Sequence, residues 1–381
     1  MRILEFFRRE KRAADPSWAA LSNGSAMSAS GQHVDAKVAE TIAAVFGCVQ
    51  ALSESTACLP PHVYQRADGG DRERADDHSL TRVLREPNSY QSGMAFRESL
   101  TASVLMHGNG YARKDYNGAG DITALHPLNP LRVSIVKLDN GRHRFDYTEE
   151  GGAVTRLLQE EVFHLRDRTE PGSIIGKSRI AVARDTLGLG LAMRSHGAAI
   201  FRNGARPSGA ISTDKLMTIE QMEAAKQHVR SIYEGTENSG KTMILTGGMT
   251  FTPISFNLED MQWIAAQQFN TEEICRIYRV PPTMVADLRH GSYSNTAELG
   301  SQFVRYSLAR WIAMWESEIK RSLIGPIARR RYYAEHSVEG LMRGNPEARA
   351  DFYGKAITSG WMTVDEVRKL ENLPALQTSG D

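Results

Sequence analysis

Cysteine is scarce in this chain of 381 residues, which carries only Cys48, Cys58 and Cys275. Three thiols are too few for a disulfide framework, and their spacing matches no zinc-binding motif. We therefore expect buried, reduced cysteines, as in a protein synthesised in the cytoplasm. Nothing in the sequence calls for a metal ion or another cofactor.

Long hydrophobic runs are also absent, and none approaches the ~18 residues that a membrane-spanning helix needs. The segment Met1–Arg12 is basic and amphipathic but has no signal-peptide core. Two interpretations stay open: a helix on a membrane surface, or an arm that docks on a neighbouring subunit or remains disordered. The small residues of Ser22–Gln32 favour the second. Residues 1–35 are therefore predicted to form an arm and linker, and no membrane partner is expected.

The chain lacks a surplus of charge of one sign, because 46 Lys and Arg stand against 45 Asp and Glu, a net charge of +1. This balance excludes a globally basic nucleic-acid binder that neutralises many phosphates. The balance remains compatible with a protein past which nucleic acid slides, because strong electrostatic attraction would slow that sliding. The chain is longer than one compact core usually needs, so two or more structural units are expected.

Recognisable catalytic motifs are missing too. No Gly-x-Ser-x-Gly, His-Glu-x-x-His or Cys-x-x-Cys pattern occurs. The charged run Asp76-Asp77-His78 is typical of a solvated loop rather than a metal site. We predict purely structural roles for four isolated histidines: His107, His126, His164 and His196.

One motif points the other way. Gly235–Thr242 fits the phosphate-binding pattern G-x-x-x-x-G-K-T residue for residue. A functional loop of this kind needs a strand before it and a helix after it. Here a capped helix precedes Gly235, and Thr242–Leu245 has the character of a strand. A nucleotide-dependent enzyme using Lys241 and Thr242 is therefore the alternative hypothesis, not the preferred one.

The first half of the chain has mixed periodicity. The spacing of apolar residues predicts helices over Lys37–Ser55 and around Met94–Met106. Strand-like stretches occupy residues 62–65 and parts of 110–148, punctuated by the turn signals Gly118–Gly120 and Asp139–Gly141. Residues 36–177 are predicted to form one α+β domain around a twisted antiparallel sheet.

Two long helices follow, separated by a small module. The first is predicted over residues 178–203, and its Gly188, Gly190 and Gly197 either break it or allow a neighbour to approach closely. The second begins at Asn257, is open to a kink where Asn270–Glu273 offers a second cap, and must end before Pro281-Pro282. Between them, residues 204–256 are predicted to form a β-α-β module, with a capping box at Thr218–Gln221 and strands at 210–213 and 242–245.

The C-terminal third begins with a long amphipathic helix, Thr296–Leu323. Trp311 and Trp315 lie in or beside its apolar stripe. They are predicted to pack in the core and not to stack on the bases of DNA. Short helices are expected after Asn345-Pro346 and at the capping box Thr363–Glu366. The stripe consists of Leu308, Ile312, Trp315, Ile319 and Leu323.

The loop from Pro281 to Asn295 lies between two helix ends. Two interpretations of it are equally open from the residues alone. It is either an ordinary surface connection or a protruding loop that contacts a polyanion through cationic and polar tips. The candidate tips are Arg289, His290, Tyr293 and Asn295.

Several of these segments together resemble the portal proteins of tailed bacteriophages, of the HK97 type. The resemblance covers roughly residues 40–376 and extends to the portals of gene transfer agents. The most specific segments are Phe201–Gly209, Thr246–Ile254, Ile274–Pro282 and Tyr293–Asn295. Supporting segments are Glu86–Asn88, Gly108–Tyr111, Leu125–Leu128 and Glu161–His164.

The resemblance implies a multi-domain α+β subunit of a ring, usually a dodecamer, at one vertex of a capsid in a virion or phage-like particle assembled in a bacterial cytoplasm. Double-stranded DNA would pass through the ring during packaging and exit. The implied parts are a wing (36–177 and 297–344), two stem helices (178–203 and 257–280), a clip (204–256), a tunnel loop (281–296) and a crown (345–381).

The resemblance also implies partners and sites. The tunnel loop would face DNA, the clip would dock terminase and then head–tail connector proteins, and the ring would contact the major capsid protein. No catalytic residue is expected. A monomeric interaction scaffold remains a third possibility. The cationic candidates for docking on the clip are Arg206, Lys215, Lys226, Arg230 and Lys241.

Overall fold

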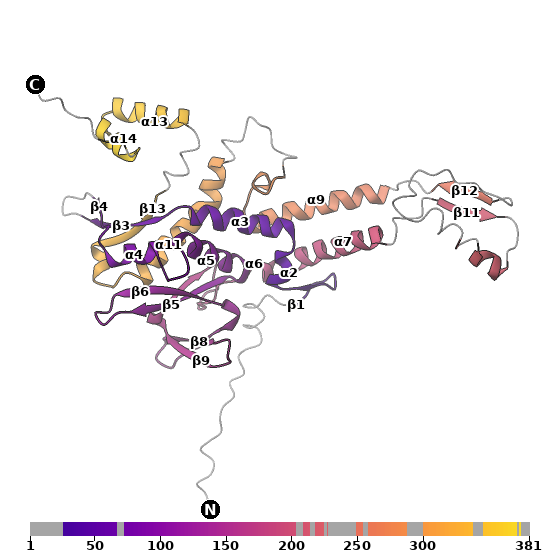
Figure 1. Ribbon diagram of the computed structural model, residues 1–381, viewed down its shortest axis with the longest axis horizontal. Helices are drawn as coiled ribbons and strands as arrows, with labels where there is room; N and C mark the ends of the chain where they lie inside the picture. Colours follow the sequence, from indigo (N-terminus) through magenta and orange to yellow (C-terminus); the bar gives the residue numbers. More distant parts are fainter. Residues whose placement is uncertain are drawn as a thin grey trace, which may run out of the picture. The chain divides into compact units, whose positions relative to one another are not determined.

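The computed structural model, whose helices and strands are labelled in Figure 1, divides into two compact units. Unit 1 is drawn from Met1–Ala51, Val104–Asn109 and Arg166–Phe303, and unit 2 from Leu52–Ser103, Gly110–Leu165 and Val304–Asp381. Each contains helices and strands, in agreement with the predicted α+β class. The structure describes residues 26–66, 72–202, 209–213, 218–224, 227, 249–253, 258–287, 300–337, 346–371 and 373–374.

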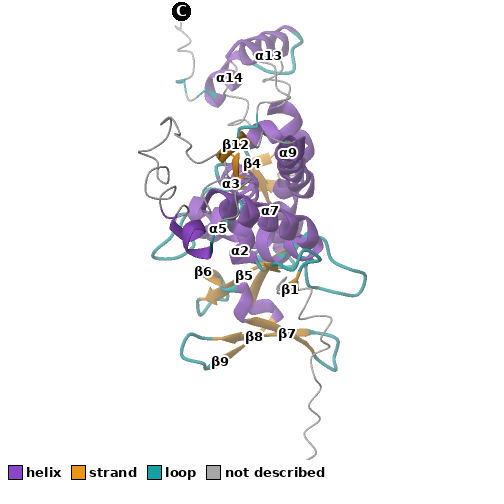
Figure 2. Cartoon of the chain, turned by 90° about the vertical axis from the view of Figure 1, so that its right-hand side faces the viewer, coloured by secondary structure: helices purple, strands orange, loops and turns teal. Residues whose placement is uncertain are grey.

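Unit 2 is built on three small sheets. Their strand orders are β13-β3-β4, β10-β5-β6 and β7-β8-β9, each three-stranded, and Figure 2 shows β7, β8 and β9 gathered apart from β5 and β6. The strands are β3 (Pro61–Arg66), β4 (Arg72–Arg74), β5 (Asn109–Tyr116), β6 (Ile122–Leu128), β7 (Val133–Lys137), β8 (His143–Thr148), β9 (Val154–Leu158), β10 (Val162–Arg166) and β13 (Tyr332–His336).

The prediction of a single sheet over residues 36–177 is wrong, for a local reason. After β6 the chain enters a 3-10 turn, Pro130–Arg132, which the side chain of Asn129 caps. The ladder of β5 and β6 ends at the pair Tyr111 and Leu128, before this turn, and after the turn β7 pairs with β8 instead of with β6. The predicted turns are confirmed, because Gly120 and Gly141 have φ angles of 87° and 80° that favour glycine.

The long C-terminal helix forms the core of unit 2. It is π-helical over Phe303–Leu308 and α-helical over α11 (Ala309–Ser322). The predicted apolar stripe is buried throughout, and Trp311 and Trp315 are only 1% and 2% exposed. The indole of Trp315 donates to Thr101 Oγ1 at 3.0 Å and contacts the rings of Phe96 and Phe163. Both tryptophans are therefore packing anchors, as predicted.

Other helices of unit 2 match the predictions, with α4 as an addition to them. α4 spans Ser79–Arg85, and α5 spans Gly93–His107 and continues into unit 1. Near the C-terminus, α13 (Pro346–Thr358) begins at its proline, and α14 (Val364–Leu370) carries the predicted capping box. In that box, Glu366 N donates to Thr363 Oγ1 at 3.2 Å, and Thr363 N donates to Glu366 Oε2 at 2.7 Å.

Unit 1 contains the predicted long helices, with two unexpected breaks. The expected helix over Lys37–Ser55 is divided into α2 (Ala36–Glu40) and α3 (Ala43–Ala57), the latter continuing into unit 2. The expected helix over 178–203 is divided into α6 (Arg179–Val182) and α7 (Arg184–Arg202) at Ala183. The next long helix, α9, runs from Leu258 to Tyr278 without interruption, roughly 30 Å at 1.5 Å per residue.

α7 and α9 lie side by side and antiparallel. A Cβ atom on Gly190 would stand 2.5 Å from Asn270 Oδ1, which confirms that a glycine here permits close approach. The side chain of Asn270 donates to Thr186 O across the pair at 2.8 Å. Asn270 therefore joins the two helices instead of kinking α9. At Gly188 the close neighbour is Ser28, outside the helix pair.

Part of the predicted module lies between these helices in the chain. β11 (Gly209–Thr213) pairs antiparallel with β12 (Met249–Pro253). At the predicted capping box, Thr218 N donates to Gln221 Oε1 at 3.1 Å. The phosphate-loop pattern Gly235–Thr242 and the strand predicted at 242–245 lie outside the described residues. No described helix is long and apolar enough to cross a membrane.

Candidate functional site

The sequence-predicted site residues lie outside the part of the chain that the structure describes. This holds for the tunnel-loop candidates Arg289, His290, Tyr293 and Asn295 and for the clip candidates Arg206, Lys215, Lys226, Arg230 and Lys241. The structure does describe the residues that lead into the loop, up to Asp287, and those that follow it from Gly300. These flanking residues show how the two ends of the loop are connected to the fold.

The chain leaves α9 through an unusual backbone path. The helix ends at Tyr278, before Pro281-Pro282 as predicted, and Arg279 takes the left-handed conformation with φ 59°. A 3-10 turn, Pro282–Val285, follows and ends at Ala286 with φ 62°. Among the described residues, only these two non-glycine residues have positive φ. Each such conformation costs about 1–3 kcal/mol, so the surrounding contacts must hold it in place.

Arg179 supplies part of that support. Its Nη1 donates to the carbonyl oxygens of Ile277 and Tyr278, each at 3.2 Å, and its Nε donates to Asp167 Oδ2 at 2.7 Å. The last carbonyls of a helix have no partner within the helix and carry partial negative charge. A guanidinium from the first residue of α6 thus caps the last turn of α9.

Asp167 is positioned in turn by a close backbone approach. Its N–H donates to Gly108 O at 2.9 Å, and a Cβ on Gly176 would lie 2.1 Å from that same oxygen. The side chain of Asn109 accepts from Gly176 N at 2.8 Å and donates to Gly176 O at 3.0 Å. The amide therefore pairs with both backbone groups of one residue, which explains Gly108 and Asn109 in the Gly108–Tyr111 segment.

The loop entrance also packs against α3. A Cβ on Gly47 would lie 3.1 Å from Val285 Cγ1. About one turn before the end of α9, Cys275 is buried against Cys48, with 4.0 Å between the two Sγ atoms. Hydrogen bonding to Cys275 and burial raise the pKa of the Cys48 thiol. Both thiols are buried as predicted, whereas Cys58 is exposed.

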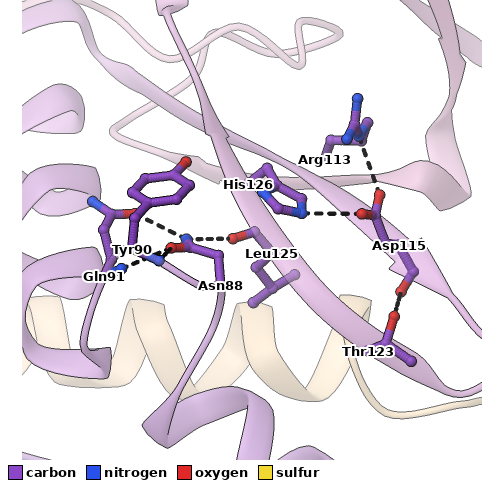
Figure 3. Close-up of polar contacts among 8 residues, drawn as sticks. All are labelled: Asn88, Tyr90, Gln91, Arg113, Asp115, Thr123, Leu125 and His126. Atoms are coloured by element: carbon purple, nitrogen blue, oxygen red, sulfur yellow. Dashed lines mark hydrogen bonds and ion pairs between the residues drawn. The ribbon is translucent and has the colours of Figure 1, made fainter.

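Two other segments that carry the resemblance meet in unit 2 (Figure 3). Asn88 Nδ2 donates to Leu125 O at 2.9 Å, and Leu125 N donates to Pro87 O at 2.7 Å. Asn88 Oδ1 accepts from Gln91 N at 2.8 Å, which closes the turn after Pro87. These bonds join Glu86–Asn88 to Leu125–Leu128.

Two of the four isolated histidines, His126 and His164, have side-chain partners among the described residues. His126 Nε2 lies 3.0 Å from Asp115 Oδ2, and Asp115 Oδ1 accepts from Arg113. His164 stacks on Tyr111 with 4.5 Å between the ring centroids. Burial lowers the pKa of His107. His196 is exposed, and no described contact assigns it a role.

The charged run beside His78 is a set of ion pairs at the surface. Asp76 accepts from Arg74 at 2.8 Å and from Arg85 at 3.2 Å. His78 Nδ1 accepts from Leu80 N and caps α4. The described residues contain no cluster of His, Cys, Asp and Glu that could hold a metal ion.

A cavity of about 520 Å³ lies in unit 2 beside Lys114. Lys114 Nζ donates to Ser322 O and Ser322 Oγ, each at 3.1 Å, at the end of α11. Burial lowers the pKa of this amine to about 8. The described contacts pair Lys114 with the helix end, and they form no nucleophile–base pair.

Known proteins similar to this chain agree with one another. The family model described as "Phage portal protein" matches residues 43–372. The portal protein of Enterobacteria phage HK97 is 33% identical over 342 residues, covering 88% of this chain and 79% of that protein. A probable portal protein of Streptomyces phage phiC31 is 28% identical over 380 residues, covering 96% and 82% respectively.

Solved structures of portal proteins and of a gene transfer agent particle also resemble this chain. A chain in the neck of an empty gene transfer agent particle is 25% identical, with a TM-score of 0.66, and covers 87% of this chain and 90% of that one. A portal protein of the HK97 family from Corynebacterium diphtheriae has the same fold at 14% identity, with a TM-score of 0.56, covering 81% and 96%. The resemblance noted in the sequence is thus confirmed, and this chain belongs to the phage portal protein family.

Proposed function

We propose that this chain forms a closed ring, a dodecamer, at one vertex of a phage or gene transfer agent capsid, through which double-stranded DNA enters and leaves. Support comes from the family and from the similar chain in a neck structure computed with six-fold symmetry, since twelve is a multiple of six. The central observation is the antiparallel pair α7 and α9, in which Arg179 caps the C-terminal end of α9 just before the loop begins.

The parts have distinct roles in this proposal. Residues 36–177 and 297–344 form the wing, 178–203 and 257–280 the stem, 204–256 the clip, 281–296 the tunnel loop and 345–381 the crown. The clip docks terminase and later the head–tail connector, and the ring contacts the major capsid protein. A near-neutral net charge suits a passage through which DNA must slide.

The ring itself performs no catalysis in this proposal. Terminase hydrolyses ATP and moves the DNA, while the ring guides and holds it. The family and the relatives named above lend no support to the alternative, a nucleotide-dependent enzyme at Gly235–Thr242. Measurable ATP binding by the wild type that is lost in Lys241→Ala would support that alternative.

The tunnel loop carries the test of DNA handling. Arg289→Ala with His290→Ala should leave the ring assembled but lower the amount of DNA packaged or retained per particle. DNA content is measured on purified particles, with ring assembly measured by native mass. A ring that falls apart would show that the loop is a subunit contact, and unchanged DNA content would show that these side chains do not act on DNA.

A further inference from the structure

Cys48 and Cys275 form a buried contact between α3 and α9, and both residues belong to unit 1. They lie 227 positions apart in the chain, and the Cys48 S–H donates to Cys275 Sγ with 4.0 Å between the sulfurs. Their relative exposures are 0% and 1%. The third cysteine, Cys58, is exposed. The two buried thiols of the chain are therefore each other's partners.

The sulfurs are close enough to be joined by a covalent bond. A disulfide holds its two sulfurs about 2 Å apart, so each sulfur of this pair has to move by about 1 Å. Rotation about the Cα–Cβ bonds of two cysteines moves their sulfurs on this scale. The packing of α3 on α9 thus brings two thiols within reach of a disulfide, although neither is near the other in the sequence.

The two thiols differ in their chemical character. The hydrogen bond from Cys48 lowers the pKa of Cys275, and the same bond together with burial raises the pKa of Cys48. The thiolate is the nucleophilic form of cysteine. Cys275 is therefore the sulfur that attacks an oxidant first, and Cys48 is the neighbouring thiol that can resolve the product.

This contact lies at the start of the tunnel loop. Gly47, next to Cys48, approaches the loop so closely that an added Cβ would lie 3.1 Å from Val285 Cγ1. Between Cys275 and Val285 the chain passes through Arg279, whose φ is 59°. Two adjacent residues of α3 thus contact both ends of this strained segment. A bond between the cysteines would fix the end that belongs to α9.

We propose that Cys48 and Cys275 are a reversible dithiol–disulfide site, which a peroxide oxidises and whose disulfide fixes the last turn of α9 to α3. Thiols of the cytoplasm are kept reduced, whereas disulfides persist outside the cell. The timing of the reaction rests on the proposed function. The ring is assembled with both thiols free, and the bond forms after the particle leaves the cell, when packaging is complete.

The reaction balances with one peroxide for each pair of thiols. Cys275, as the thiolate, attacks one peroxide oxygen, the O–O bond breaks, and the departing hydroxide takes up the proton that Cys275 released. The Cys48 sulfur then attacks the sulfenic acid at Cys275, so that an S–S bond forms and the S–O bond breaks. The second hydroxide leaves as water with the Cys48 proton. The two sulfurs give up two electrons, which reduce the peroxide to two waters.

The test uses the full-length assembled protein with Cys58→Ser, which removes the exposed thiol. Hydrogen peroxide is added at neutral pH, and it is small enough to enter through local openings of the packing. Peptide mapping should find Cys48 linked to Cys275. Both thiols should be lost from the subsequently unfolded protein and should return with a phosphine reductant. Oxidation should also raise the midpoint of thermal unfolding by about 5 °C, because a cross-link restricts the unfolded chain.

Cys48→Ala in the same background is the matched control. This variant keeps Cys275 but has no resolving thiol, so peroxide should give no linked peptide and no rise in the midpoint. The sulfenic acid at Cys275 should accumulate instead, and labelling with dimedone detects it. Labelling in the control together with the linked peptide in its parent would support the order of attack.

Three outcomes would overturn the inference. They are two intact thiols under conditions that oxidise Cys58 in the wild type, sulfinic or sulfonic acids without a link, and a link that leaves the midpoint unchanged or lowers it. These measurements involve neither DNA nor a capsid, so their failure would leave the proposed channel untouched. A failed DNA-retention test of the tunnel loop would likewise leave a mapped disulfide standing.

Discussion

The guanidinium of Arg179 donates to the carbonyl oxygen of Tyr278 at 3.2 Å and also lies over the ring of the same residue, 5.7 Å from its centre. One side chain thereby contacts both the backbone and the ring of the last residue of α9. Tyr278 is 1% exposed, and burial raises the pKa of its hydroxyl. The residue directly before the strained Arg279 is therefore fixed on two sides.

Arg179→Ala should lower the free energy of unfolding by about 3 kcal/mol, because it removes one partner of a largely buried ion pair with Asp167. The measurement is equilibrium unfolding in urea. Arg194→Ala is the control, since that exposed arginine of α7 contacts only Thr41 among the described partners and should cost under about 1 kcal/mol. Equal losses in the two variants would contradict the assigned role.

Gly190→Ala should destabilise the protein by about 1–3 kcal/mol, although alanine is the better helix former by about 1 kcal/mol. The new Cβ would meet Asn270 Oδ1 at 2.5 Å and displace the amide that joins α9 to Thr186. Thermal unfolding measures the effect. Gly354→Ala in α13, where the added Cβ meets nothing within 4 Å, should be neutral or stabilising. A stabilising Gly190→Ala would refute the close contact.

In a thiol titration of the native protein with Ellman's reagent, one thiol per chain should react quickly. Cys58 is exposed, whereas Cys48 and Cys275 are buried and the pKa of Cys48 is raised. Burial keeps the reagent from both thiols of the pair, so they should respond only after unfolding in denaturant. Cys58→Ser should remove the fast phase. Rapid reaction of two or three thiols in the native wild type would contradict the packing of α3 on α9.

Lys114 should make stability rise with pH over a defined range. Burial lowers its pKa in the folded state from 10.5 to about 8. Between these values the unfolded chain binds more protons than the folded one, so the free energy of unfolding increases with pH. Below about pH 8 the folded state carries the full cost of the buried charge. Unfolding of wild type and Lys114→Met at pH 7 and pH 10 tests this, and equal pH slopes would contradict it.

Local signals in the sequence predicted local structure well. The stripe from Leu308 to Leu323 is buried, the capping boxes at Thr218 and Thr363 form, and α9 ends before Pro281. In each case the cause lies within about one helical turn or in a regular spacing. Such causes can be identified from neighbouring residues alone.

Long-range contacts were the part that could not be predicted. The sequence around Asn270 predicts a helix cap, but the partner of its side chain is Thr186, 84 positions away. No local pattern assigns Arg179 a role, because its partners Asp167 and Tyr278 are set by tertiary packing. The three separate sheets depend on strand pairings such as β13 with β3. The tunnel-loop and clip residues remain predictions of the sequence.

The mass and shape of the purified assembly test the central claim most directly. Electron micrographs with native mass measurement should show closed rings of twelve copies, with an open central channel wide enough for duplex DNA. Monomers alone at all concentrations, or rings whose centre is filled by the chain itself, would contradict the account.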